Sequence, residues 1–398
     1  MNSLNFNYEN ELSKCKTLED ITGKGGFVQR IVKNALERVL QEEFNQYIDN
    51  NEGIYRNGTT KKVVKTEYGN IPVNVPRDRI SSFNPEVIEK RNTTSDGIKR
   101  QITAMYAKGM STRDISDHIE SMYGTALSAT TISNITDESL IYGKEWFNRT
   151  LDEVYPIVFM DAVHYKVKDE NKIVTKAAYV ALGITKEGRK EVLGIWIGEN
   201  EGAKFWLKVC TEIKNRGVKD ILIACIDGLT GFPDAIHTVF PNTKIQLCII
   251  HQIRNSVKYI NYKEQKEFVQ DLKGVYKAIS AEEGLNTLND MYDKWGKKYG
   301  MVLDSWLNKW DNLSTFYDYE DRIRKIIYTT NTLEGLNRQL RKTTKTKTVF
   351  PTDDSLLKSL YLTINDISKK WITPYPNWGQ TISQFQIYFQ DRLQSELY

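Results

Sequence analysis

Two aspartates stand directly behind apolar runs that have the length of buried strands. Asp161 follows the run 157–160, and Asp227 follows the run 221–226. A carboxylate at the end of a buried strand is costly unless a metal ion or a hydrogen-bond donor compensates it. Asp227 and Gly228, taken alone, are typical of an ordinary turn. The two aspartates together favour a functional site over two unrelated turns.

A third acid, Glu334, lies in a segment whose leucines recur at helical spacing. A helix over 332–343 places the leucines on one stripe and Glu334 on another stripe, together with cations. The leucine stripe is Leu333, Leu336 and Leu340, and the other stripe is Glu334, Arg338, Arg341 and Lys345. An alternative role for Glu334 is a capping box with Asn331 as the N-cap residue. The two roles compete because the side chain has one carboxylate.

Asp161, Asp227 and Glu334 are the ligand types that a two-metal site for phosphoryl transfer requires. Mg²⁺ prefers carboxylate oxygens, and Mn²⁺ is the expected substitute. In such a site one ion activates the attacking oxygen and the other stabilises the leaving oxygen. Asp161 is the ligand expected to bridge both ions. The sequence therefore predicts these three acids as catalytic residues and as metal ligands.

Several cations follow Glu334, and no acid stands among them. They are Arg338, Arg341, Lys342, Lys345 and Lys347. A row of this kind is suited to run along a DNA backbone that leads to the acids. The alternative is a solvated helix end whose cations complement the negative end of the helix dipole.

Cys248 and His251 form a Cys-x-x-His step at the end of a strand expected over 244–250. The spacing suits two zinc ligands, but the other histidines are dispersed and no second ligand pair stands nearby. We therefore favour a role in packing or in positioning DNA near the acids. Arg254 and Asn255 lie just beyond and are predicted to contact phosphate.

The segment from 157 to 250 has the element order of a ribonuclease H-like core. Strands are expected at 157–160, 173–184, 191–197, 220–226 and 244–250, and a helix is expected at 203–215. The predicted fold class is α/β, with a ribonuclease H-like catalytic core made of a mixed five-stranded sheet flanked by helices. Residues 261–319 turn helical and aromatic, and we expect an all-α insertion whose tryptophans fill its interior.

The residues before this core are predicted to form small DNA-binding modules. Helical spacing predicts a helix over 27–49, and alternating β-branched and polar residues predict a basic β-hairpin over 53–79. Three helices are expected within 98–140, with N-caps at Ser111 and Ser128, as in a helix-turn-helix domain whose third helix reads DNA. The alternative is a helical bundle that only spaces two domains. The predicted domains are 1–52 (helical), 53–92 (β-hairpin), 93–150 (helix-turn-helix-like), 151–260 with 320–398 (catalytic) and 261–319 (insertion).

Composition agrees with a globular protein and excludes several classes. The chain has 398 residues, of which 40% are hydrophobic and 27% are charged, with 24 Gly and 9 Pro. These proportions exclude collagen-like, mucin-like and largely disordered proteins. No uninterrupted apolar run reaches the roughly 18 residues of a membrane span, and the four cysteines lack the spacing of a disulfide framework. We expect a cytoplasmic protein, associated with the nucleoid of a bacterial cell. The net charge of +4 means that DNA contacts must come from local clusters.

Six segments together resemble the Mutator-like transposases of bacterial insertion sequences. They are YRNGTTKKVVKTEYGNIPVNVPRDR, MYAKGMSTRDISDHIESMYG, FMDAVHYKV, CIDGLTGFPDAI, LCIIHQIRNS and YTTNTLEGLNRQLRK. The resemblance covers nearly the whole chain. It implies that Asp161, Asp227 and Glu334 form the Asp-Asp-Glu triad of a ribonuclease H-like transposase, with an all-helical insertion between the second Asp and the Glu. It also suggests a donor-strand route through a circular intermediate.

The function predicted from these features is that of a DNA transposase of an insertion sequence. It binds the terminal inverted repeats of its element, hydrolyses a phosphodiester at the element's end with Mg²⁺, and transfers the freed strand to target DNA. Two ends processed together imply a homodimer or a larger synaptic complex. The alternatives are a catalytically inactive DNA-binding protein derived from a transposase, and a ribonuclease H-like structure-specific nuclease.

Overall fold

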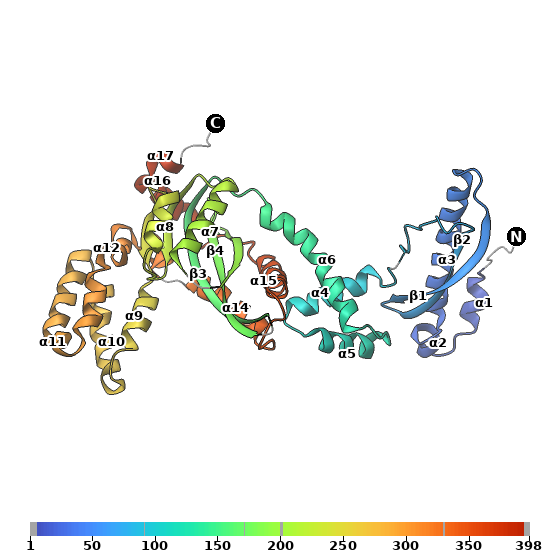
Figure 1. The fold of residues 1–398 in the computed structure, drawn as a ribbon, viewed down its shortest axis with the longest axis horizontal. Coiled ribbons are helices and arrows are strands. Elements are labelled where there is room, and N and C mark those ends of the chain that lie inside the picture. The colour runs from blue at the N-terminus through green and yellow to red at the C-terminus, as the bar shows by residue number, and fades with distance from the viewer. Residues whose placement is uncertain (1–5, 91, 171, 200–201, 329–330, 394–398) are drawn as a thin grey trace. The chain divides into compact units, whose positions relative to one another are not determined.

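The computed structural model describes residues 6–90, 92–170, 172–199, 202–328 and 331–393. These residues divide into two compact units, Met1–Ser139 and Leu140–Tyr398 (Figure 1). The finer division into five domains stays a prediction. Within the described ranges, no helix combines the length and the apolar character that a membrane crossing requires.

The first part of the N-terminal unit is a β-hairpin packed on a long helix. The hairpin consists of β1 (Arg56–Thr66) and β2 (Gly69–Asp78), and β2 lies against α3 (Phe27–Asp49). Gly69 adopts a φ of 95°, which lets the chain reverse within two residues. A small buried cluster joins the hairpin to the helix, and its members are Leu40, Val64, Ile71, Val73 and Ile88. Two short helices precede this module, α1 (Tyr8–Ser13) and α2 (Leu18–Thr22).

Three helices follow, as the sequence predicts. They are α4 (Asp96–Ala107), α5 (Thr112–Tyr123) and α6 (Ala129–Asn148). Both expected N-caps are present, because Ser111 accepts a hydrogen bond from the amide of Asp114 and Ser128 accepts one from the amide of Thr131. The helix-turn-helix role of these helices stays a prediction.

A mixed five-stranded sheet forms the centre of the C-terminal unit and confirms the predicted sheet. Its order is β5-β4-β3-β6-β7, with β3, β4 and β5 antiparallel and with β6 and β7 parallel to β3. The bounds are β3 (Val154–Asp169), β4 (Lys172–Ile184), β5 (Lys190–Gly198), β6 (Asp220–Ile226) and β7 (Lys244–Leu247). β3 is much longer than the predicted 157–160, because its second half continues with alternating burial after the apolar run ends.

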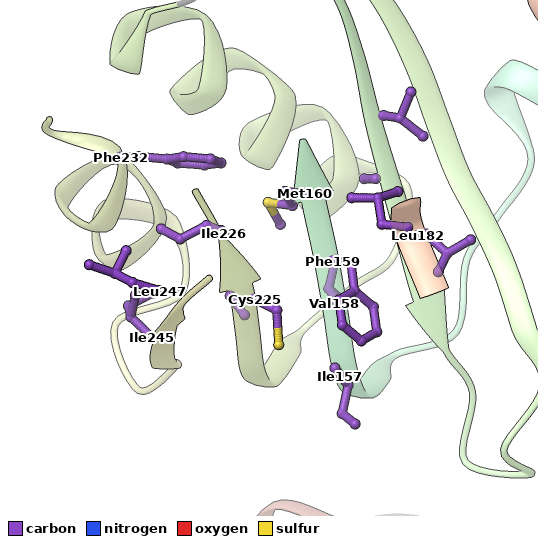
Figure 2. Close-up of a cluster of buried hydrophobic side chains, with 14 of the residues drawn as sticks. Ile157, Val158, Phe159, Met160, Leu182, Cys225, Ile226, Phe232, Ile245 and Leu247 are labelled. Carbon is purple, nitrogen blue, oxygen red and sulfur yellow. The ribbon is translucent and has the colours of Figure 1, made fainter. Parts of the chain in front are cut away.

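Helices cover this sheet and bury its apolar side chains (Figure 2). The ring of Trp206 stacks on Phe232 at 4.3 Å and joins α7 to α8. α14 contacts β3, and α15 contacts β5. The bounds of the helices that flank the sheet are α7 (Ala203–Asn215), α8 (Phe232–Val239), α14 (Asn331–Thr344), α15 (Asp353–Ser368), α16 (Trp378–Tyr388) and α17 (Gln390–Leu393).

The segment after the last strand is helical, as predicted for the insertion. Trp295 and Trp306 are buried in it, which confirms the prediction that they fill its interior, and Trp310 is partly buried. The elements of this segment are α9 (Ile249–Val257), α10 (Tyr262–Lys277), α11 (Ala281–Leu307), α12 (Trp310–Leu313), the 3₁₀ helix η1 (Thr315–Asp318) and α13 (Asp321–Ile327).

The predicted strand over 244–250 is too long. β7 ends at Leu247, because Cys248 caps the next helix and its sulfur accepts a hydrogen bond from the amide of His251 at 3.4 Å. The apolar Ile249 and Ile250 belong to the first turn of α9. A short apolar run does not by itself distinguish a strand from a buried helical turn.

Candidate active site

The sheet brings Asp161 and Asp227 together. β3 and β6 are parallel neighbours, and Phe159 lies opposite Cys225 in their register. Continuing this register by two residues, past the end of β6, brings Asp161 and Asp227 near each other, and Asp227 acts electrostatically on Asp161 (Figure 2 shows Met160 and Ile226, the residues just before them, on neighbouring strands). Asp161 lies within β3 and not at its end, whereas Asp227 directly follows β6.

Asp161 has two hydrogen-bond donors within the described residues. The amide of Ala162 donates to Oδ1 at 2.9 Å, and Nδ2 of Asn337 donates to Oδ2 at 2.8 Å. Burial raises the pKa of the Asp161 carboxyl above its ordinary value, and the nearby Asp227 raises it further. His251 and Arg341 oppose this rise through their positive charges. The charge of Asp227 therefore disfavours the ionised form of Asp161.

Asp227 also belongs to a turn. Its Oδ1 accepts a hydrogen bond from the amide of Leu229 at 3.3 Å, and the carbonyl of Gly228 accepts one from Nζ of Lys309 at 3.1 Å. Asp227 can belong to this turn and also lie near Asp161. Its nearness to Asp161 follows from its position directly after β6, which the turn does not change.

Glu334 lies in the first turn of α14 and contacts a cation of another helix. Its Oε1 is 2.8 Å from Nη1 of Arg254 on α9. The angles of this ion pair are not those of a hydrogen bond, and Oε1 accepts none from the described residues. The side chain of Asn331, the partner in the alternative capping box, lies outside the described part of the structure. The leucine stripe of α14 is buried as predicted.

Two residues of α9, His251 and Arg254, interact with the acids, and Cys248 caps this helix. Cys248, His251 and Arg254 recur every three residues, which places them on one side of the helix. Cys248 is the main cause that raises the pKa of His251 to about 9, and Asp161 and Asp227 add to it while burial opposes it. His251 is therefore a cation beside the two aspartates at neutral pH.

The acids do not form a ready-made metal cluster. Among the residues that the structure describes, no group of three or more His, Cys, Asp or Glu side chains is arranged to hold a metal ion. Glu334 is paired with Arg254 in this arrangement. Cys248 caps α9, and the side chain of His251 interacts electrostatically with Asp161 and Asp227. Within the described ranges, no further His, Cys, Asp or Glu completes a zinc site around them.

The cations at the end of α14 and just beyond it separate into an exposed group and one partly buried residue. Arg338, Arg341, Lys342 and Lys345 are exposed, as the predicted stripe requires. Lys347 is only partly exposed, and its place in the predicted row stays a prediction. Burial lowers the pKa of Lys347 to about 8, and its Nζ lies 6.0 Å from the ring centre of Phe350. Helix α14 ends at Thr344, so Lys345 and Lys347 lie beyond it.

Comparison with known proteins assigns the chain to a family. The model described as "Transposase, Mutator family" matches residues 5–374. The chain belongs to the Mutator family of transposases. It is 40% identical over 379 residues to the transposase for insertion sequence element ISRM3 of Rhizobium meliloti, which covers 94% of this chain and 95% of the relative.

Further relatives of this Mutator-family chain carry similar names. The probable transposase for insertion sequence element ISRM3-like of Sinorhizobium fredii is 40% identical over 94% of this chain and 95% of its own length. The transposase for insertion sequence element IS905 of Lactococcus lactis is 30% identical over 86% of this chain and 90% of its own length. The resemblance found in the sequence motifs is thereby confirmed.

The structure adds one residue to the site of this Mutator-family protein that the sequence reasoning missed. Asn337 is almost fully buried, at 4% exposure, and it connects α14 to Asp161. A signal was available, because Asn337 stands one turn after Glu334 on the same side of the predicted helix. A buried amide at that position requires a polar partner.

Proposed function

We propose that this protein is a DNA transposase of an insertion sequence, which cleaves and transfers DNA strands with Asp161, Asp227 and Glu334. The observation that carries the proposal is the juxtaposition of Asp161 on β3 and Asp227 just after the parallel neighbour β6, with the helix that bears Glu334 joined to Asp161 through Asn337. Several relatives at 30–40% identity are named as transposases of insertion sequences, which supports the same class of reaction.

The catalytic core is proposed to be ribonuclease H-like. Three antiparallel strands, a helix, and two further strands with a helix between them follow one another in the chain. The long helical segment from α10 to α13 stands between the second aspartate and the glutamate. This order supports an Asp-Asp-Glu enzyme with an all-α insertion.

The donor set fits Mg²⁺, or Mn²⁺ in its place. Three carboxylates supply the hard oxygen ligands that these ions prefer. Burial and Asp227 both raise the pKa of Asp161, so a divalent cation would relieve a repulsion that the protein otherwise sustains. Asp161 and Asp227 would hold the cation, and Glu334 would join them after leaving Arg254. Bound metal ions supply activation of the attacking oxygen and stabilisation of the leaving oxygen.

The chain's own residues position the acids and the DNA. Asn337 orients the carboxylate of Asp161 by donating to Oδ2. The exposed Arg338, Arg341, Lys342 and Lys345, together with Arg254, are proposed to bind phosphates of the strand near the acids. The β-hairpin and the three helices of the N-terminal unit are proposed to bind the terminal inverted repeats. A homodimer or larger complex would process two ends together.

The test is cleavage of the element's own ends by two variants. Asp161→Asn and Glu334→Gln should abolish Mg²⁺-dependent cleavage and leave end binding intact. The matched controls are Asp290→Asn and Glu282→Gln on α11, which should cleave like the wild type. The pKa of Asp161 is raised in the folded protein, so its ionised form destabilises the fold. Asp161→Asn removes this charge and should therefore not lower the free energy of unfolding at neutral pH.

Three outcomes would overturn or redirect the proposal. Cleavage retained by either variant would refute the assignment of the triad. Specific end binding by the wild type without any nicking would favour the inactive DNA-binding protein. Cleavage of junctions in random duplexes, without joining of strands, would favour the structure-specific nuclease.

A further inference from the structure

Helix α10 separates its charges onto two sides. Its acids face α11 and are paired there. Glu264 lies 2.6 Å from Nζ of Lys298, and Asp271 lies 2.7 Å from Nζ of Lys294. Glu267 also contacts Lys294, at 2.8 Å. The negative charges of α10 are therefore neutralised within the insertion (Figure 1 shows α10 beside α11).

The other side of α10 forms a groove that carries only positive charge. The groove has a volume of about 780 Å³, and no Asp or Glu lines it among the described residues. Lys263, Lys266 and Lys273 line it, and all three are exposed. None of them takes part in an ion pair between described residues. Tyr262 and Tyr276 also line the groove, and Tyr262 is 87% exposed.

The groove begins next to the candidate active site. Val257, at the C-terminal end of α9, lines it. Arg254 stands one helical turn before Val257, so the two side chains are neighbours on the helix surface. Arg254 in turn contacts Glu334. Helix α9 therefore links the third acid, through Arg254, to the end of the groove at Val257.

We propose that this groove, lined by Lys263, Lys266 and Lys273, binds the phosphate backbone of the DNA that extends from the candidate active site. The inference rests on the proposed action on DNA and names a second surface that holds it. Lysines that form no ion pair with the described residues and stand beside the exposed ring of Tyr262 suit a polyanion with aromatic bases. A protein partner would need acidic side chains at the same spacing, whereas DNA supplies regularly spaced phosphates along its whole length.

The experiment measures the salt dependence of DNA binding by the full-length protein. A fluorescent duplex of random sequence is titrated by anisotropy between 50 and 200 mM salt, without divalent metal. The groove variant is the triple substitution Lys263→Gln, Lys266→Gln and Lys273→Gln. The control variant is Lys204→Gln, Lys297→Gln and Lys370→Gln, which removes the same charge from exposed positions on other elements.

The plot of log K against log salt has a negative slope. The groove variant should make this slope shallower by about 2 to 3, because each phosphate contact contributes roughly 0.9 to its magnitude. The control variant should leave the slope close to that of the wild type. Equal slopes for the two variants would overturn the inference and leave a solvated lysine face. Thermal unfolding of both variants is the folding control. An unfolding temperature close to that of the wild type excludes misfolding as the cause of a weaker salt dependence.

The two proposals fail separately. A wild type that cleaves element ends, combined with equal slopes for the two triple variants, refutes the groove and leaves the transposase. A reduced slope in the groove variant, combined with a wild type that does not cleave, refutes the proposed function and leaves a DNA-binding groove.

Discussion

Arg254→Gln should strengthen the binding of Mn²⁺ by the DNA-free protein. Arg254 places Nη1 at 2.8 Å from Oε1 of Glu334, so a cation that uses Glu334 as a ligand must first displace a positive charge. Gln keeps much of the length of the side chain and removes the charge. In the variant, metal binding no longer has to break the ion pair between Arg254 and Glu334.

The magnitude follows from the exposure of the pair. The side chain of Arg254 is 57% exposed and that of Glu334 is 31% exposed, so solvent screens most of their attraction. Pairs of this kind contribute about 0.2 to 1 kcal/mol. Since about 1.4 kcal/mol corresponds to a tenfold change in a dissociation constant, Mn²⁺ should bind about 1.4- to fivefold more tightly.

The assay is a titration of Mn²⁺ followed by the electron paramagnetic resonance signal of the free ion, at low salt and without DNA. Arg338→Gln is the matched control, because it removes one positive charge from α14 without breaking the Arg254 pair. Arg254→Gln should bind Mn²⁺ more tightly than Arg338→Gln does, and the difference should shrink as salt rises. Equal or weaker binding by Arg254→Gln would refute the view that this pair competes with metal.

Two further predictions concern stability. The folded pKa of His251 is about 9, above its ordinary value of 6.5, so its favourable contribution is present below about pH 6.5 and is lost as pH rises toward 9. In metal-free buffer, His251→Gln should be less stable than the wild type at pH 6 by urea unfolding and should approach it at pH 9; a constant gap would contradict the charge pairing. Trp306→Ala should lower the free energy of unfolding by about 3 to 5 kcal/mol, because Trp306 is fully buried and its Nε1 donates to Oγ of Ser256 at 2.9 Å. A loss below about 1 kcal/mol would show that the insertion does not depend on this side chain.

Local patterns in the sequence predicted most elements of the site. The apolar runs before Asp161 and Asp227 located two neighbouring strands, and the leucine spacing around Glu334 located α14 and its buried side. The same method misplaced the end of β7, because the apolar residues after Leu247 satisfy a strand and a helical turn equally well. It also could not tell that Lys347 is less exposed than the other four cations of the row.

The sequence by itself determined which groups are available: two aspartates behind apolar runs, a glutamate on an amphipathic helix, and cations on that helix. Only the tertiary structure decided which groups meet. Asn337 donates to Asp161, and Arg254 pairs with Glu334, although each pair is far apart in the chain. Periodicity reports which side of an element is buried, because burial acts along one helix or strand. It does not report which elements pack together, and that packing sets the partners of Asp161 and Glu334 and raises the pKa of Asp161.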